Sequence, residues 1–144
     1  MLARLRKAKE NGEGGFTLIE LLVVMIIIGI LAAIAIPVFL NQRAKARDTA
    51  TKADVSTIGK EIASYYVDQT GSVTVAVDPA TRTATLSSGT TPITTTDTSD
   101  GTELSNQTTG SDATNFCVAL TNDGGSASAI WKYSAAGGLQ PGGC

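Results

Sequence analysis

The feature that most constrains this 144-residue chain is an apolar run that contains one charged residue. Between Phe16 and Leu40 nearly every side chain is aliphatic or aromatic, and Glu20 carries the only charge. As a helix, about 25 residues extend roughly 37 Å at about 1.5 Å per residue. That length exceeds the roughly 30 Å hydrocarbon core of a bilayer. The run therefore predicts a membrane-crossing helix.

Glu20 needs a partner, because a lone carboxylate in lipid costs a few kcal/mol unless it is paired or near the interface. The glycine pair Gly14-Gly15 immediately precedes the run. A cut after Gly15 leaves a charged amine on Phe16, about one helical turn from Glu20. We hypothesise that Glu20 of one protomer pairs with the Phe16 amine of the next. Misregistered neighbours would bury an unpaired charge, so this pair sets the stagger between protomers.

The stretch "GGFTLIELLVVMIIIGILAAIAIPVF" closely resembles the leader junction and N-terminal helix of type IV pilins and pseudopilins. The resemblance implies that a prepilin peptidase cuts between Gly15 and Phe16 on the cytoplasmic side and methylates the Phe16 amine. Glu20 matches the assembly glutamate of the family. Gly29 and Pro37 match its helix glycine and kink-forming proline, between which the helix unwinds in some filaments.

The predicted fold class is α+β, the type IV pilin fold, in four segments. These are a leader over residues 1–15, a transmembrane and filament-core helix over 16–40, its amphipathic continuation over 41–70, and a β-rich domain over 71–144. A helical spacing of apolar residues after the apolar run predicts a face that packs on the domain. That face comprises Val55, Ile58, Ile62 and Tyr65. The opposite, solvated face comprises Lys52, Asp54, Lys60 and Glu61. Gly71 is the predicted stop of the helix.

Beyond Gly71, alternating residues predict an antiparallel sheet of about four strands. The first hairpin covers residues 72–77 and 82–87 around the turn "DPAT", and the second covers 115–121 and 126–135 around "NDGG". The Thr-, Ser- and Gly-rich stretch 87–112 is predicted to be a long surface loop, and residues 136–144 an irregular tail. Trp131 is expected to belong to the small core.

Cys117 and Cys144 are the only cysteines. In an exported domain they predict a disulfide, which matches the C-terminal disulfide loop of many pilins. With no histidine in the sequence, His-containing metal sites and Ser-His-Asp or Cys-His nucleophiles are excluded. We expect no enzyme activity and no cofactor. A weak calcium candidate remains at Asp97, Asp100 and Glu103. Asn106-Gln107-Thr108 matches the N-x-T glycosylation sequon, which by itself decides nothing.

The predicted function is a structural subunit, a major pilin, that polymerises through its apolar helix. The resemblance implies these partners: copies of itself in a helical homopolymer, the prepilin peptidase, an assembly platform with its ATPase, minor pilins, and the membrane before assembly. The precursor would cross the cytoplasmic membrane once with its N-terminus inside, and the filament would be extracellular. The charge distribution indicates no nucleic-acid groove, although a polymer leaves DNA binding open.

Two alternatives stay open. One is a pseudopilin of a type II secretion or competence pseudopilus. The other is a monomeric, signal-anchored module that binds a ligand through Trp131, Tyr133 and the loops. The sequence leaves undecided whether a filament serves adhesion, twitching motility, DNA uptake or secretion.

Overall fold

The computed structural model describes residues 15–108, 112–126 and 129–144, so most of the predicted leader lies outside the described residues. The helix α2 runs over Leu18–Asp68 and ends shortly before Gly71, the predicted stop. Within the described residues, seven strands follow it: β1 (Val73–Asp78), β2 (Thr83–Ser88), β3 (Thr91–Asp97), β4 (Thr102–Thr108), β5 (Cys117–Asn122), β6 (Trp131–Ser134) and β7 (Gly138–Pro141). The α+β class and the type IV pilin layout of one long helix followed by antiparallel sheet are confirmed.

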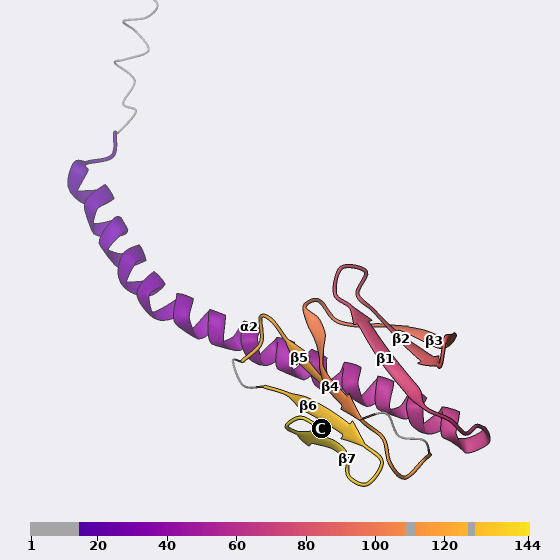
Figure 1. Ribbon diagram of the computed structural model, residues 1–144. Helices are drawn as coiled ribbons and strands as arrows, with labels where there is room; N and C mark the ends of the chain where they lie inside the picture. Colours follow the sequence, from indigo (N-terminus) through magenta and orange to yellow (C-terminus); the bar gives the residue numbers. More distant parts are fainter. Residues whose placement is uncertain (1–14, 109–111, 127–128) are drawn as a thin grey trace, which may run out of the picture. The chain divides into compact units, whose positions relative to one another are not determined.

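The strands form two antiparallel sheets, in the orders β1-β2-β3 and β4-β5-β6-β7 (Figure 1). Both predicted hairpins are present, as the pairs β1–β2 and β5–β6. In the first turn, Thr81 and the Ala80 N–H donate to the Asp78 carboxylate. These bonds hold the pKa of Asp78 below its usual range.

Three strands were missed by the sequence prediction, so the estimate of about four strands was wrong. The predicted loop 87–112 contains β3 and β4, and the predicted tail 136–144 contains β7. Threonine favours extended backbone, and pairing with a neighbour satisfies the N–H and C=O groups without an apolar side chain. A search for apolar alternation cannot detect such strands.

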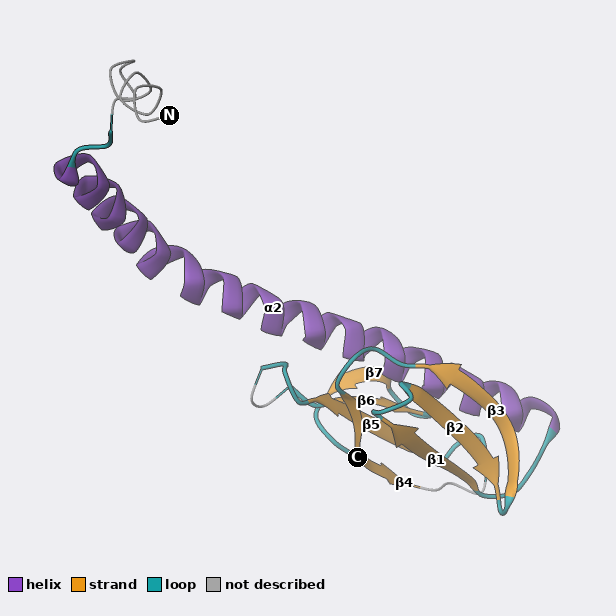
Figure 2. Cartoon of the chain, turned by 90° about the horizontal axis from the view of Figure 1, so that it is seen from above, coloured by secondary structure: helices purple, strands orange, loops and turns teal. Residues whose placement is uncertain are grey.

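The described part of residues 40–144 forms one compact unit, and the buried apolar side chains described there form one core. The α2 face contributes Val55, Ile58 and Ile62 as predicted, but Tyr66 is the buried tyrosine while Tyr65 is half-buried. Tyr65 instead donates from its hydroxyl to Ser88 Oγ at 3.1 Å. The strands and the segment before β5 complete the core with Val73, Val75, Ala84, Leu86, Phe116, Val118 and Leu120. Figure 2 shows this part of α2 lying along the strands.

The ring of Tyr133 packs directly on the helix at Gly59, where an added Cβ would overlap it. Tyr133 also stacks on Phe116, with ring centroids 6.4 Å apart. A glycine in a helix interior costs about 1 kcal/mol relative to alanine. Here it permits the close approach of β6 to α2.

The two sheets meet through a side chain. Gln107 of β4 accepts the Val75 N–H at 2.8 Å and donates from Nε2 to the Val75 carbonyl at 3.0 Å. The side-chain amide thus satisfies both backbone groups of a β1 residue, as a neighbouring strand would. This side chain therefore connects β4 of the second sheet to β1 of the first.

Candidate functional site

The apolar segment, residues 16–39, includes the first part of α2 and belongs to a unit separate from residues 40–144. Its large apolar side chains are all exposed, from 46% at Val23 to 90% at Phe16. By length and composition, α2 qualifies as a candidate membrane span, and its most apolar stretch is 0% buried. Isolated apolar side chains on a surface are ordinary, but a contiguous patch of this extent marks a surface that binds lipid or protein.

Glu20 has a partner within its own chain. Its carboxylate accepts the Thr17 N–H at 2.8 Å and the Thr17 hydroxyl at 2.7 Å, while Thr17 Oγ1 accepts the Glu20 N–H at 3.2 Å. This reciprocal pattern is a capping box at the N-terminus of the helix. The sequence analysis missed Thr17, although the T-x-x-E spacing signals it. The capping box keeps the carboxylate hydrogen-bonded at the start of the apolar segment.

Gly29 and Pro37 both lie within α2, which is assigned as helix throughout. Proline has no N–H to donate to the preceding turn, and glycine lowers helix propensity. Unwinding between these two positions therefore stays a prediction for an assembled state.

In the compact unit, side chains of α2 hold two loops in the same way. The Asp54 carboxylate accepts the Ser99 N–H at 2.9 Å and the Ser99 hydroxyl at 3.1 Å, and also the Thr102 hydroxyl at 2.8 Å. The Asp48 carboxylate accepts the Ser126 N–H and hydroxyl at 2.9 and 2.5 Å. Each carboxylate thus binds one serine at two points. Asp54 was predicted to be solvated, which is wrong.

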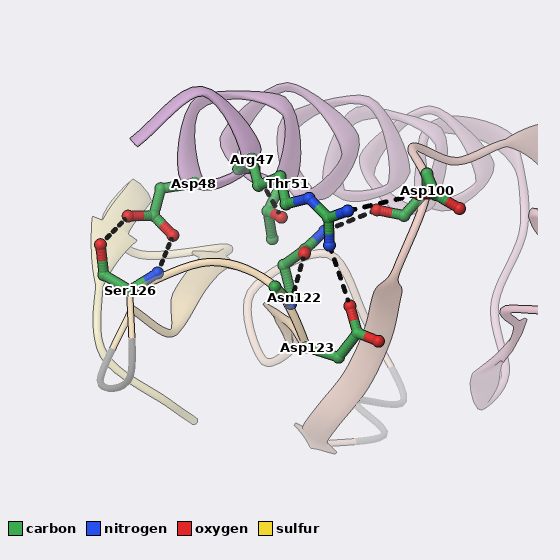
Figure 3. Close-up of polar contacts among 8 residues, drawn as sticks. Arg47, Asp48, Thr51, Asp100, Asn122, Asp123 and Ser126 are labelled. Carbon is green, nitrogen blue, oxygen red and sulfur yellow. Dashed lines mark hydrogen bonds and ion pairs between the residues drawn. The ribbon is translucent and has the colours of Figure 1, made fainter. Parts of the chain in front are cut away.

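Arg47 lies between these two loops (Figure 3). Its guanidinium is 3.6 Å from an Asp100 oxygen and 3.4 Å from Asp123 Oδ1. Asn122 joins the loops by donating from Nδ2 to the Asp100 carbonyl at 2.8 Å. Both acids are well exposed, so each ion pair by itself contributes little to stability. We call Arg47, Asp48 and Asp54 with their loop partners the polar clamp.

The calcium candidate is not supported by this arrangement. Asp100 faces Arg47, which already supplies a positive charge. Among the described residues, no group of three or more acidic, histidine or cysteine side chains is placed to hold a metal ion. Asp97 ends β3, and Glu103 is an exposed residue of β4. The three candidate ligands are therefore close in sequence but do not form a cluster in the structure.

Trp131 and Tyr133 are half-buried and pack against the core, as expected for Trp131. The Lys52 ammonium lies 3.8 Å from the centroid of the Trp131 ring, a cation–π contact. Lys52 was predicted to be solvated, and this contact corrects that. The two aromatic rings therefore serve packing, which removes the main support for a monomeric binding module.

Cys117 and Cys144 form the predicted disulfide, with Cα atoms 5.8 Å apart and a sequence separation of 27. A cross-link over a loop of this size stabilises the folded state by about 3.5 kcal/mol in the chain-entropy model.

Comparison with known proteins points to one superfamily. The family model of the prokaryotic N-terminal methylation motif matches residues 11–36. The chain is 39% identical over 60 residues to the type II secretion system core protein G of Pseudomonas aeruginosa, covering 42% of each chain. It is 48% identical over 54 residues to the type IV wide pilus major component PilA4 of Thermus thermophilus, covering 38% of this chain and 41% of that protein. The N-terminal part of the chain is thus similar to that of type IV pilins and type II secretion pseudopilins.

Another relative, the type IV major pilin protein PilA of Myxococcus xanthus, is 42% identical over 55 residues, or 38% of this chain and 25% of that protein. The chain thus spans less than half the length of each of these relatives. No solved structure matches the chain. The relatives are named as pilus and secretion-system components, not as enzymes.

Proposed function

We propose that this chain is the major subunit of a type IV pilus and polymerises through residues 16–40. The observation that carries the proposal is the contiguous exposure of every large apolar side chain in that segment. In the precursor these side chains contact lipid, and in the filament they contact the same segment of other copies. Gly29, Ala32, Ala33 and Ala35 permit close helix–helix approach.

Processing precedes assembly in this proposal. A prepilin peptidase cuts between Gly15 and Phe16 and methylates the Phe16 amine on the cytoplasmic side. The match to the N-terminal methylation motif spans this junction, which supports the assignment. An assembly platform with its ATPase then extracts the helix from the membrane, and minor pilins join the filament.

Glu20 has two roles in this scheme. In the membrane, the capping box with Thr17 satisfies part of its hydrogen-bonding capacity and lowers the cost of the charge. During assembly, the carboxylate binds the Phe16 amine of a neighbouring protomer and sets the axial register.

A pseudopilin of a type II secretion system is the second candidate. The 39% identity to core protein G of that system favours it. Both functions use the same N-terminal processing and helix packing. They differ in whether filaments reach the cell surface at native expression levels.

The test is an intact mass with N-terminal peptide sequencing on sheared surface material and on membranes. A major pilin predicts abundant surface protein that begins at methylated Phe16 and carries the disulfide. Methylated protein confined to the cell envelope supports the pseudopilin instead. Protein that still begins at Met1 in every fraction would contradict both.

A further inference from the structure

The C-terminal residues 142–144, which we call the C-terminal strap, cross the second sheet from one edge to the other. They follow β7, and Cys144 bonds to Cys117 of β5 while its N–H donates to Asn106 of β4. In the order β4-β5-β6-β7, β7 and β4 are the two edge strands. Edge strands of a four-stranded sheet are roughly 14 Å apart at about 4.8 Å per step. The strap therefore lies over the face of the sheet.

The residues beneath the strap identify which face it covers. Side chains alternate between the two faces of a strand, so Ala119 points away from the core residues Val118 and Leu120. Ala119 is nevertheless 0% exposed. Its register partners are Asn106 on β4 and Lys132 on β6. Cys117 lies two residues from Ala119 and so shares this face, which places the strap above Ala119.

Two glycines let the strap take this path. Gly142 leaves β7 with φ of 100°, a conformation that favours glycine, and its N–H donates to the Ile130 carbonyl at 2.8 Å. At Gly143, a Cβ would lie only 3.2 Å from the side-chain atoms of Asn106. The absence of a side chain at Gly143 thus lets the strap pass close to Asn106.

Asn106 then binds Cys144, one of the two cysteines of the disulfide. Its Oδ1 accepts the Cys144 N–H at 3.1 Å, across 38 positions of sequence. We propose that Asn106 is a positioning residue that docks Cys144 on β4 and so favours its bond with Cys117. The amide of the N-x-T sequence thereby has a structural partner, and its neighbour Gln107 joins the two sheets. This role does not depend on polymerisation.

The covalent step is an ordinary thiol–disulfide exchange. One protein thiolate attacks glutathione disulfide and releases one glutathione thiolate. The second protein thiolate then attacks the mixed disulfide and releases the second. Two protein thiols lose two protons and two electrons, and two molecules of reduced glutathione form. Docking by Asn106 acts on the second attack, because it holds the two cysteines near one another.

The test uses the full chain in detergent micelles, equilibrated with mixtures of reduced and oxidised glutathione. Alkylation and intact mass give the fraction of protein disulfide, and from it the effective concentration of the two thiols. Asn106→Ala and the similarly sized Asn106→Leu should each lower that concentration about fivefold, the factor expected when one hydrogen bond of about 1 kcal/mol is lost. Ser105→Ala, at an exposed neighbour on the same strand, is the matched control and should stay within about twofold of the parent.

An effective concentration for both Asn106 variants within about twofold of the parent would overturn the proposal. Where the reduced variants fail to fold, amide hydrogen exchange of the oxidised proteins decides instead. Faster exchange at Cys144 in Asn106→Ala, with unchanged exchange in β5, supports docking. Unchanged exchange at Cys144 contradicts it.

Discussion

The two parts of α2 share one secondary structure but differ in where their apolar side chains lie. In residues 18–39 the apolar side chains surround the helix and are exposed on every side. In residues 40–68 the buried apolar side chains lie on one face, where Val55, Ile58 and Ile62 pack on the strands of the same chain. A helix keeps a polar face where it meets water, and loses it where lipid or other helices surround it. The difference separates a part that folds within one chain from a part that needs other molecules.

The largest expected effect comes from replacing one isoleucine by alanine in each part of α2 and comparing the two variants. Ile58→Ala removes a fully buried side chain and should lower the free energy of unfolding by about 2–5 kcal/mol. Ile28→Ala changes a side chain that is 60% exposed and should alter it by less than about 0.5 kcal/mol. Denaturant unfolding of the full chain in detergent measures both. Equal losses would show that the apolar part also packs within the monomer.

The polar clamp gives the next effect, on the part of α2 that packs on its own strands. Asp54→Ala leaves the Ser99 N–H and two hydroxyls without their acceptor, and should cost about 2 kcal/mol of unfolding free energy. Glu61→Ala removes an exposed carboxylate from the same helix and serves as the control. Thermal unfolding followed by circular dichroism compares them. A loss as small as that of the control would mean that water replaces the clamp without cost.

A substitution at Glu20 tests whether the exposed part of α2 drives filament assembly. Glutamine at this position keeps a capping box but loses the charge. Glu20→Gln should therefore lower filament yield at least about tenfold, equivalent to about 1.4 kcal/mol, while the helix persists. Thr17→Ala removes the two capping contacts of the hydroxyl, keeps the backbone N–H contact and the charge, and should reduce yield less. Quantified sheared filaments give the measurement, and normal yield and register for Glu20→Gln would remove the proposed pairing with Phe16.

The smallest effect concerns the β1–β2 turn, which lies outside both parts of α2. Because the folded-state pKa of Asp78 is lowered, its carboxylate contributes stability above the unfolded-state pKa. That contribution falls as the pH drops through the folded-state pKa, since the carboxyl is then protonated in both states. Asp78→Asn should therefore be slightly less stable than the parent at pH 7, and the difference should shrink below about pH 4. Tm values of the parent and of Asp78→Asn, measured over a pH series, check this. A difference in Tm that widens on acidification would contradict the prediction.

Sequence reasoning succeeded where a pattern is local and repeated. The continuous apolar run predicted the exposed part of α2, and the spacing of Val55, Ile58 and Ile62 predicted its buried face. It failed at β3, β4 and β7, where pairing with other strands forms a sheet without a clear apolar alternation. It also assigned Lys52 and Asp54 to solvent, because a helical wheel does not show which loops fold over it.

By itself, the sequence determined where the apolar run begins and ends, and that two cysteines are present to form a disulfide. Each of these depends on neighbouring residues or on side-chain chemistry alone. Only the tertiary structure decided that Asp54 holds the Ser99 loop, that Gln107 joins two sheets, and that Asn106 meets Cys144. These contacts link residues between 32 and 45 positions apart, and polar side chains of the same kinds occur throughout the chain. Which of them pair is set by strand register and by the path of the backbone, and neither is encoded in a short stretch of sequence.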